Sequence, residues 1–116
     1  ALTPSGQQDS MRAANGLSPN LIHSLDAAIA QSVVSRLKEE GVDDVTAVHD
    51  SFGVHAAHAA TLDRIIREVA IETFQSNVLE DFAKVCQTQI KQQLPPLPVQ
   101  GTFEVERLTT SEFFFA

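Results

Sequence analysis

Apolar residues recur at helical spacing in three stretches of the chain, and the first of these follows a polar N-terminal segment. Ser18 and Pro19 suit an N-cap and a first helical position, and Gly41 suits the stop after a helix. Between them the apolar positions lie three or four residues apart: Leu21, Ile22, Leu25, Ile29, Val33 and Leu37. This pattern predicts a helix that begins near Ser18, after a flexible lead-in over residues 1–17.

Two further helices are predicted after about Ala57. The first has one apolar face, Leu62, Ile65, Ile66, Val69, Ala70 and Phe74, and one polar face, Asp63, Arg64, Arg67, Glu68 and Glu72. Asn77 suits the cap of the second, whose expected buried stripe is Leu79, Phe82, Val85, Cys86 and Ile90. A proline-rich run at 95–98 must end it. We expect the two helices to pack as a hairpin.

The segments that could form β-strands are short. Val45–Val48 is apolar and partly β-branched, and residues 52–55 suit a partner strand across a tight turn at Asp50 and Ser51. Alternation at residues 103–105 predicts one more short strand, and residues 106–111 suit a helical turn. The expected fold is therefore α+β and mostly helical, with a β-hairpin packed by three main helices.

Composition and charge narrow the class of protein. The chain has 116 residues, 43% of them hydrophobic and 20% charged, and no apolar run approaches the roughly 20 residues that cross a bilayer. We expect a soluble, cytoplasmic protein without a membrane segment, because no export signal precedes residue 18 and Cys86 is the only cysteine. A net charge of -7 argues against a nucleic-acid binder that works alone, since phosphate contacts need clustered Lys and Arg.

The strongest candidate for chemistry is Asp50, which the hairpin places at its tip. Mg²⁺ prefers oxygen ligands, so a carboxylate there suits metal binding, but aspartate is also a favoured turn residue. The neighbours His49 and Ser51 do not form a catalytic triad with it, because adjacent strand residues point to opposite faces. His55 and His58 lack the Cys or carboxylate partners of a zinc site.

Three stretches, in this order, resemble one family. They are Pro-Asn-Leu-Ile-His-Ser-Leu-Asp-Ala at 19–27, Val-His-Asp-Ser-Phe-Gly-Val-His-Ala at 48–56 and Glu-Phe-Phe-Phe-Ala at 112–116. Together they are similar to the C-terminal part of single-subunit DNA-directed RNA polymerases of bacteriophages and mitochondria. The resemblance runs from Ser18 to Ala116 and implies that residues 18–116 are a C-terminal palm fragment.

The resemblance also implies roles for individual residues. His49-Asp50-Ser51 is similar to palm motif C, so Asp50 would be one of two aspartates that bind catalytic Mg²⁺ during nucleotidyl transfer. His23 would contact the primer and template, and His49 and Ser51 would lie beside the substrate or nucleic acid. The ending Phe114-Phe115-Ala116 resembles the C-terminal foot of the family, to which we give a structural role.

The sequence departs from the family by what it lacks. It contains neither the second aspartate motif nor the fingers helix that binds the ribonucleotide, and its first residue is not Met. We therefore expect a fragment that is inactive alone, whose intact parent uses a DNA template, nascent RNA and NTPs. The parent would work in the host cytoplasm if it is phage-encoded, with the mitochondrial matrix as the other location.

Two other interpretations remain open from the residues. One is a non-catalytic interaction or scaffold module in which Asp50 is only a turn residue, and the other is a fragment of a family A DNA polymerase, which shares motif C. Because a lone hairpin exposes a free edge, we also expect the chain to self-associate, as a two-fold homodimer.

Overall fold

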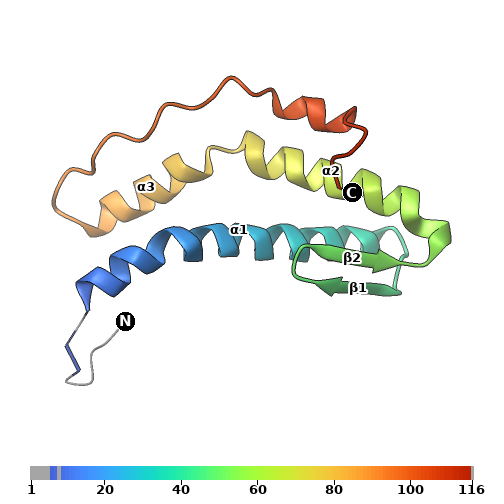
Figure 1. The fold of residues 1–116 in the computed structure, drawn as a ribbon, viewed down its shortest axis with the longest axis horizontal. Coiled ribbons are helices and arrows are strands. Elements are labelled where there is room, and N and C mark those ends of the chain that lie inside the picture. The colour runs from blue at the N-terminus through green and yellow to red at the C-terminus, as the bar shows by residue number, and fades with distance from the viewer. Residues whose placement is uncertain (1–5, 8, 116) are drawn as a thin grey trace. The chain divides into compact units, whose positions relative to one another are not determined.

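A computed structural model describes residues 6–7 and 9–115 of the chain. Along the sequence it contains α1 (Ser10–Glu39), β1 (Val45–Val48), β2 (Ser51–Val54), the 3-10 helix η1 (Ala56–His58), α2 (Ala59–Gln75), α3 (Val78–Gln89) and the 3-10 helix η2 (Val105–Thr109) (Figure 1). The expected α+β fold, mostly helical with one hairpin, is confirmed. The chain divides into two compact units, residues 1–56 and residues 57–116, which we describe one at a time. The assignment of residues 18–116 to one polymerase domain stays a prediction.

Helix α1 begins earlier than the sequence predicted. Asp9 is its N-cap, and the Asp9 carboxylate accepts a hydrogen bond from the backbone N–H of Arg12 at 3.0 Å. The predicted start at Ser18 is wrong, because residues 10–17 are helical and Pro19 lies inside the helix. The large apolar residues of this first part of the helix, Met11 and Leu17, are both exposed and do not recur at helical spacing, so periodicity could not reveal it.

The end of α1 agrees with the prediction and has a specific geometry. Gly41 takes a φ of 81°, and its N–H donates to the carbonyl of Lys38 at 3.0 Å. The N–H of Val42 donates to the carbonyl of Leu37 at 2.9 Å, which completes a Schellman motif. Val42 and Leu37 are both buried, as the two apolar positions of this motif commonly are.

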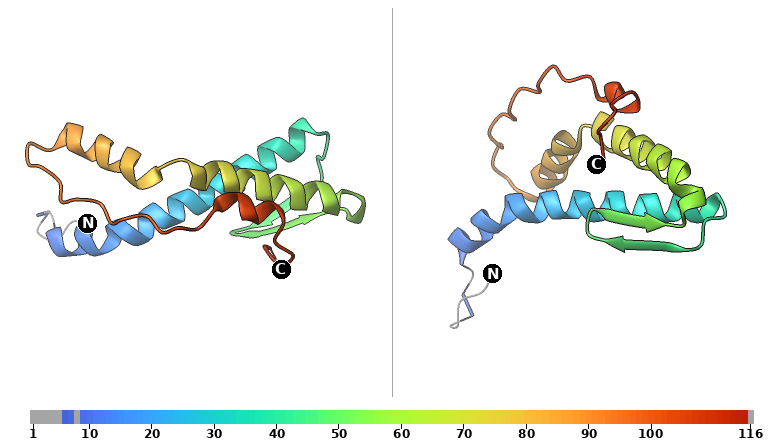
Figure 2. Two further views of the ribbon diagram at one scale, coloured as in Figure 1. Left: turned by 90° about the horizontal axis from the view of Figure 1, so that it is seen from above. Right: turned by 45° about the vertical axis from the view of Figure 1, so that its right-hand side comes forward.

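The hairpin follows this turn. β1 and β2 pair antiparallel with Val45 opposite Val54 and Val48 opposite Ser51, so the loop consists of His49 and Asp50. The predicted turn at Asp50 and Ser51 is therefore wrong by one position. Strand β1 contacts α1, and the right-hand view of Figure 2 shows the hairpin along the C-terminal half of that helix.

In the second unit, α2 provides the buried residues. Its predicted apolar face is confirmed at Ile65, Ile66, Val69 and Ala70, but Phe74 is 53% exposed. Helix α3 buries none of its residues, so the stripe expected on it is not a core. The main packing partner of α2 within the unit is η2 and not α3, which makes the predicted helical hairpin wrong. None of the helices in the described part of the chain is long and apolar enough to cross a membrane.

The region after the prolines contains no strand among its described residues. The alternation at 103–105 predicted one, but Val105 instead begins η2, which agrees with the helical turn expected just after it. Alternation over so few residues does not distinguish a strand from an extended lead into a helical turn, because both place successive side chains on opposite sides.

The Schellman turn gives a first prediction. The substitution Gly41→Ala should lower the free energy of unfolding by about 1 kcal/mol, because the residue has a positive φ that a Cβ disfavours, although no atom lies within 4 Å of that Cβ. Gly101→Ala is the matched control: its Cβ also meets nothing within 4 Å, but its φ is not positive. Urea denaturation followed by circular dichroism measures both, and equal effects would contradict the assignment.

Candidate functional site

The tip of the hairpin consists of His49 and Asp50. Both are exposed, and His49 has a φ of 55°, in the left-handed region that few residues other than glycine adopt. A positive φ at the first loop position is the geometry of the primed turns, whose twist matches that of the flanking strands. His is among the residues that tolerate this region best. The turn therefore places the Asp50 carboxylate in solvent at the end of a regular ladder.

This tip forms one wall of an open cleft of about 730 Å³ in the first unit. Helix α1 forms the other wall, and the lining residues are His23, Asp26, Ala27, Ala30, Gln31, Ala47, His49 and Asp50. Three of the four residues expected to contact metal, substrate or nucleic acid thus share one cleft: His23, His49 and Asp50. Ser51 is not among the lining residues; it is the first residue of β2 and pairs with Val48.

Chain geometry explains why residues so far apart in sequence meet here. A strand rises about 3.3 Å per residue and a helix about 1.5 Å. The few residues from Val42 to Asp50 therefore travel back about as far as the helix advanced from His23 to Leu37. The Schellman turn at Gly41 starts this return, so the tip arrives at the level of His23.

Small side chains keep the cleft open. His23, Asp26, Ala27 and Ala30 follow one another at three- and four-residue spacing, which places them on one face of α1. Ala27 and Ala30, with Ala47 on β1, contribute only methyl groups to the lining. Longer apolar residues at these positions would fill the space between the helix and the tip.

Close packing between the strands fixes the hairpin behind the tip. Thr46 and Gly53 are directly opposite, and the Thr46 hydroxyl donates to the Gly53 carbonyl at 3.4 Å. A Cβ at position 53 would lie only 2.6 Å from Thr46 Oγ1. Glycine at this position therefore lets the threonine hydroxyl reach the partner backbone.

The cleft supplies carboxylate oxygen but no complete metal site. Mg²⁺ is commonly held by one or two carboxylates together with substrate phosphates. The exposed Asp50 fits one such ligand, and the half-buried Asp26 is a second carboxylate on the same lining. Within residues 6–7 and 9–115, no group of three or more His, Cys, Asp or Glu side chains could hold a metal ion.

Two residues were missed by sequence reasoning. Asp26 lies within the quoted block at 19–27 but was given no role, although its spacing from His23 indicates a shared helix face. Arg67 was assigned to a solvent face, yet its side chain is only 14% exposed and contacts the residues after η2. Among the predicted foot residues, Phe114 and Phe115 have ring centroids 5.9 Å apart, and Ala116 lies outside the described residues.

Comparison with known proteins bears on the identity of the chain. A family model for DNA-dependent RNA polymerase matches residues 3–95, which include the hairpin and all three α-helices. The DNA-directed RNA polymerase of Enterobacteria phage T3 is 32% identical over 114 residues, which cover 93% of this chain and 13% of the phage protein. No solved structure matches the chain.

Similar plant proteins are also DNA-directed RNA polymerases. DNA-directed RNA polymerase 1A of Nicotiana tabacum is 33% identical over 98 residues, which cover 84% of this chain and 63% of the tobacco protein. DNA-directed RNA polymerase 2, chloroplastic/mitochondrial, of Nicotiana sylvestris is 35% identical over 98 residues and is covered to 10% of its length. The resemblance to phage and organellar RNA polymerases is confirmed. The chain spans only a small part of most of these relatives.

The contact between Thr46 and Gly53 gives a second prediction. Gly53→Ala should destabilise the chain by about 1 kcal/mol, because the new Cβ displaces the Thr46 hydroxyl and breaks its hydrogen bond. In a Thr46→Ala background the same substitution should cost nothing, because the obstructing oxygen is gone. Urea denaturation of the four proteins of this double-mutant cycle measures the coupling, and strictly additive effects would argue against it.

Proposed function

The chain belongs to the DNA-dependent RNA polymerase family, and from that premise we propose that it supplies part of the catalytic centre of a single-subunit, phage-type enzyme. The proposed reaction is ribonucleotidyl transfer directed by a DNA template. The observation that carries this proposal is the cleft in which Asp50, at the hairpin tip, faces the helix that bears His23. A polymerase centre needs a carboxylate in reach of a nucleic-acid end, and this cleft offers both an open volume and that carboxylate.

We assign the metal-binding role to Asp50. Its carboxylate is exposed, so no other side chain has to be displaced before an ion and a substrate phosphate approach it. When bound, Mg²⁺ would neutralise charge on the reacting phosphoryl group and on the attacking and leaving oxygens. A second carboxylate from outside this cleft, or Asp26 within it, would complete the oxygen ligands.

We assign a nucleic-acid contact to His23. The side chain is exposed on the helical wall of the cleft, opposite the tip. An imidazole can donate or accept a hydrogen bond, so it suits contact with a base edge or sugar at the growing 3′ end. His49 contributes chiefly through its backbone, whose positive φ shapes the turn that presents Asp50. Ser51 belongs to the ladder and orients the tip from β2.

Charge explains why we propose that the chain is inactive by itself. Its formal net charge is -7, with only eight Lys and Arg residues, whereas gripping a template and NTPs needs clustered positive charge. The template, nascent RNA and NTPs would therefore be held mainly by other parts of the polymerase. We propose the host cytoplasm as the site of action for a phage-encoded parent.

A chimeric polymerase gives the third prediction. When this chain replaces the matching part of the phage T3 enzyme, Asp50→Asn should lower templated RNA synthesis by at least about a thousandfold, because metal clamps supply several kcal/mol of transition-state stabilisation. Asp44→Asn is the matched control, since Asp44 is also exposed and directly precedes the hairpin. Its chimera should keep the activity of the unsubstituted chimera.

Two results would overturn the proposal. The first is equal activity of the Asp50→Asn and Asp44→Asn chimeras, which would reduce Asp50 to a turn residue and favour a scaffold module. The second concerns the isolated chain: templated RNA synthesis above its own Asp50→Asn variant would refute the proposed inactivity.

A further inference from the structure

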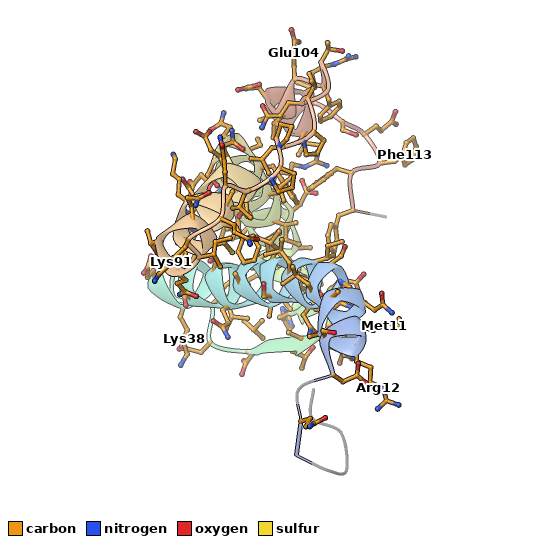
Figure 3. The ribbon with its side chains drawn as sticks, turned by 90° about the vertical axis from the view of Figure 1, so that its left-hand side faces the viewer. Met11, Arg12, Lys38, Lys91, Glu104 and Phe113 are labelled. Carbon is orange, nitrogen blue, oxygen red and sulfur yellow. The ribbon has the colours of Figure 1, made fainter. Side chains whose placement is uncertain are left out.

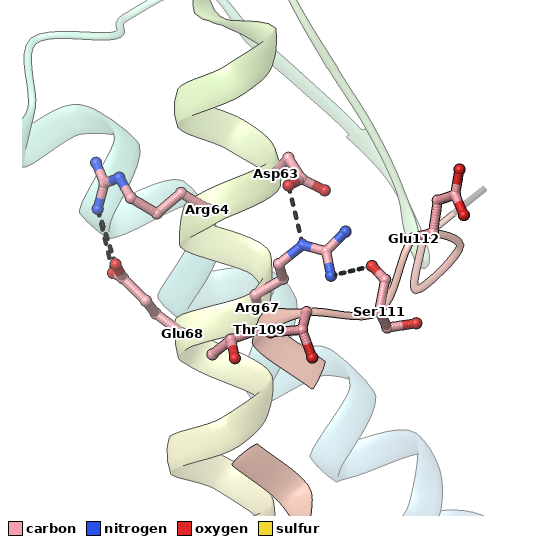
Figure 4. A pocket seen from close by; sticks show the side chains of 8 residues that line it. Asp63, Arg64, Arg67, Glu68, Thr109, Ser111 and Glu112 are labelled. Atoms are coloured by element: carbon pink, nitrogen blue, oxygen red, sulfur yellow. Dashed lines mark hydrogen bonds and ion pairs between the residues drawn. The ribbon is translucent and has the colours of Figure 1, made fainter. Parts of the chain in front are cut away.

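The guanidinium of Arg67 joins α2 to η2 and to the residues that follow it. Arg67 Nη1 donates to the carbonyl of Leu108 at 2.6 Å. It also donates to the carbonyl of Ser111 at 2.7 Å, and Nε pairs with Asp63 at 2.9 Å (Figure 4). The guanidinium carbon also lies 5.6 Å from the centroid of the Phe114 ring. One side chain thus contacts four residues, three of them more than forty positions away in sequence.

The accepting carbonyl of Leu108 lies in the last turn of η2, and that of Ser111 lies just beyond the C-cap, Thr110. The last carbonyls of a helix have no partner within the helix, and cationic side chains near a C-terminus can satisfy them. Here the cation comes from another helix, so that Arg67 caps η2 from outside. Hydroxyls at the same end of η2 donate to two other carbonyls, from Thr109 to Glu106 at 2.8 Å and from Thr110 to Arg107 at 3.2 Å.

We propose that Arg67 is a positioning residue that holds the C-terminal segment, residues 105–115, in one place on α2. Three properties of the group support this. Its side chain is only 14% exposed, so its hydrogen bonds are shielded from water. Asp63 orients the guanidinium from one turn earlier on the same helix. Only a planar fork reaches two carbonyls, a carboxylate and an aromatic face together, which a lysine ammonium does not reproduce.

A second tether between α2 and η2 is more open to water. Gln75 Nε2 donates to Glu106 Oε1 at 2.7 Å, and both residues are exposed. The pKa of Glu106 lies below its ordinary value, mainly because its own backbone N–H donates to the carboxylate and also because Gln75 does. This tether does not involve Arg67, so it offers a matched comparison within the same interface.

Phe113 and Phe114 also differ in their exposure to water. Phe114 is half-buried beside Arg67, whereas Phe113 is 76% exposed and extends away from the ribbon (Figure 3). Of these two rings, the clamp therefore acts on that of Phe114. A probe on Phe114 should report its loss, and the same probe on Phe113 should not.

Amide hydrogen exchange of the chain tests the clamp. In Arg67→Gln and in Arg67→Lys, the amides of η2 should exchange about tenfold faster, while those of α2 keep their rates, because only the docking of the segment is lost. Gln75→Ala should change η2 exchange much less. If Arg67→Gln also speeds amide exchange in α2, the proposal is judged on Arg67→Lys, because this variant keeps a positive charge on the helix.

Fluorine spectra supply a second readout that a general loss of stability does not imitate. With 4-fluorophenylalanine in the chain, the Phe114 resonance should move in Arg67→Lys, and the Phe113 resonance should stay. The two resonances are assigned with Phe114→Leu and Phe113→Leu. Unchanged η2 exchange and an unchanged Phe114 resonance in Arg67→Lys would overturn the proposal, as would an equal exchange effect of Gln75→Ala.

One further experiment rests on the proposed polymerase function. In the phage chimera, Arg67→Lys and Phe114→Leu should each lower RNA synthesis, and the double variant should lower it no further, because both remove the same clamp. Phe113→Leu should have no effect. An inactive unsubstituted chimera would count against the proposed function alone, since the clamp is judged on exchange and fluorine spectra of the chain itself.

Discussion

The sharp end of α1 is the constraint on which the candidate site depends. Gly41 accepts a positive φ, which lets Val42 fold its N–H back to Leu37 and bury its own side chain beside the helix. The chain then returns along α1 as strand β1. Because a strand advances about twice as far per residue as a helix, a very short hairpin reaches back to His23. If α1 ended without this tight turn, the hairpin tip would not face the helical wall that completes the cleft.

At the tip, the backbone and the side chains have separate tasks. His49 takes up the unusual φ, and the opposite pair Thr46 and Gly53 packs closely behind it, so the turn is determined by backbone geometry. Asp50 is then free to remain in solvent, as the metal-binding role proposed for it requires. The cleft is wide because alanines line it, and it carries little positive charge, which agrees with a part that works inside a larger polymerase.

The second unit is organised around α2 and not around a helical pair. Its buried residues lie on α2, and the end of the chain is fastened to the same helix by Arg67, through backbone carbonyls that any sequence would offer. Because every residue has a backbone carbonyl, the amino-acid sequence does not indicate which carbonyls will accept these hydrogen bonds. Helix α3 has a clear amphipathic pattern, yet none of its residues is buried. A periodic pattern therefore predicts which face a helix could bury, but not whether a partner within the described chain covers that face.

The sequence by itself determined the class of fold, the family and the position of Asp50 in a turn. Helical periodicity, Gly41 and the ordered motifs are local features, so they could be read without knowing which segments meet. Only the tertiary structure decided the turn register, the shared cleft of His23 and Asp50, and the burial of Arg67. Each of these depends on contacts between residues distant in sequence, and a one-residue change of register is invisible to a pattern of four-residue strands. The start of α1 escaped prediction for a related reason: a helix that buries nothing there leaves no periodic signal.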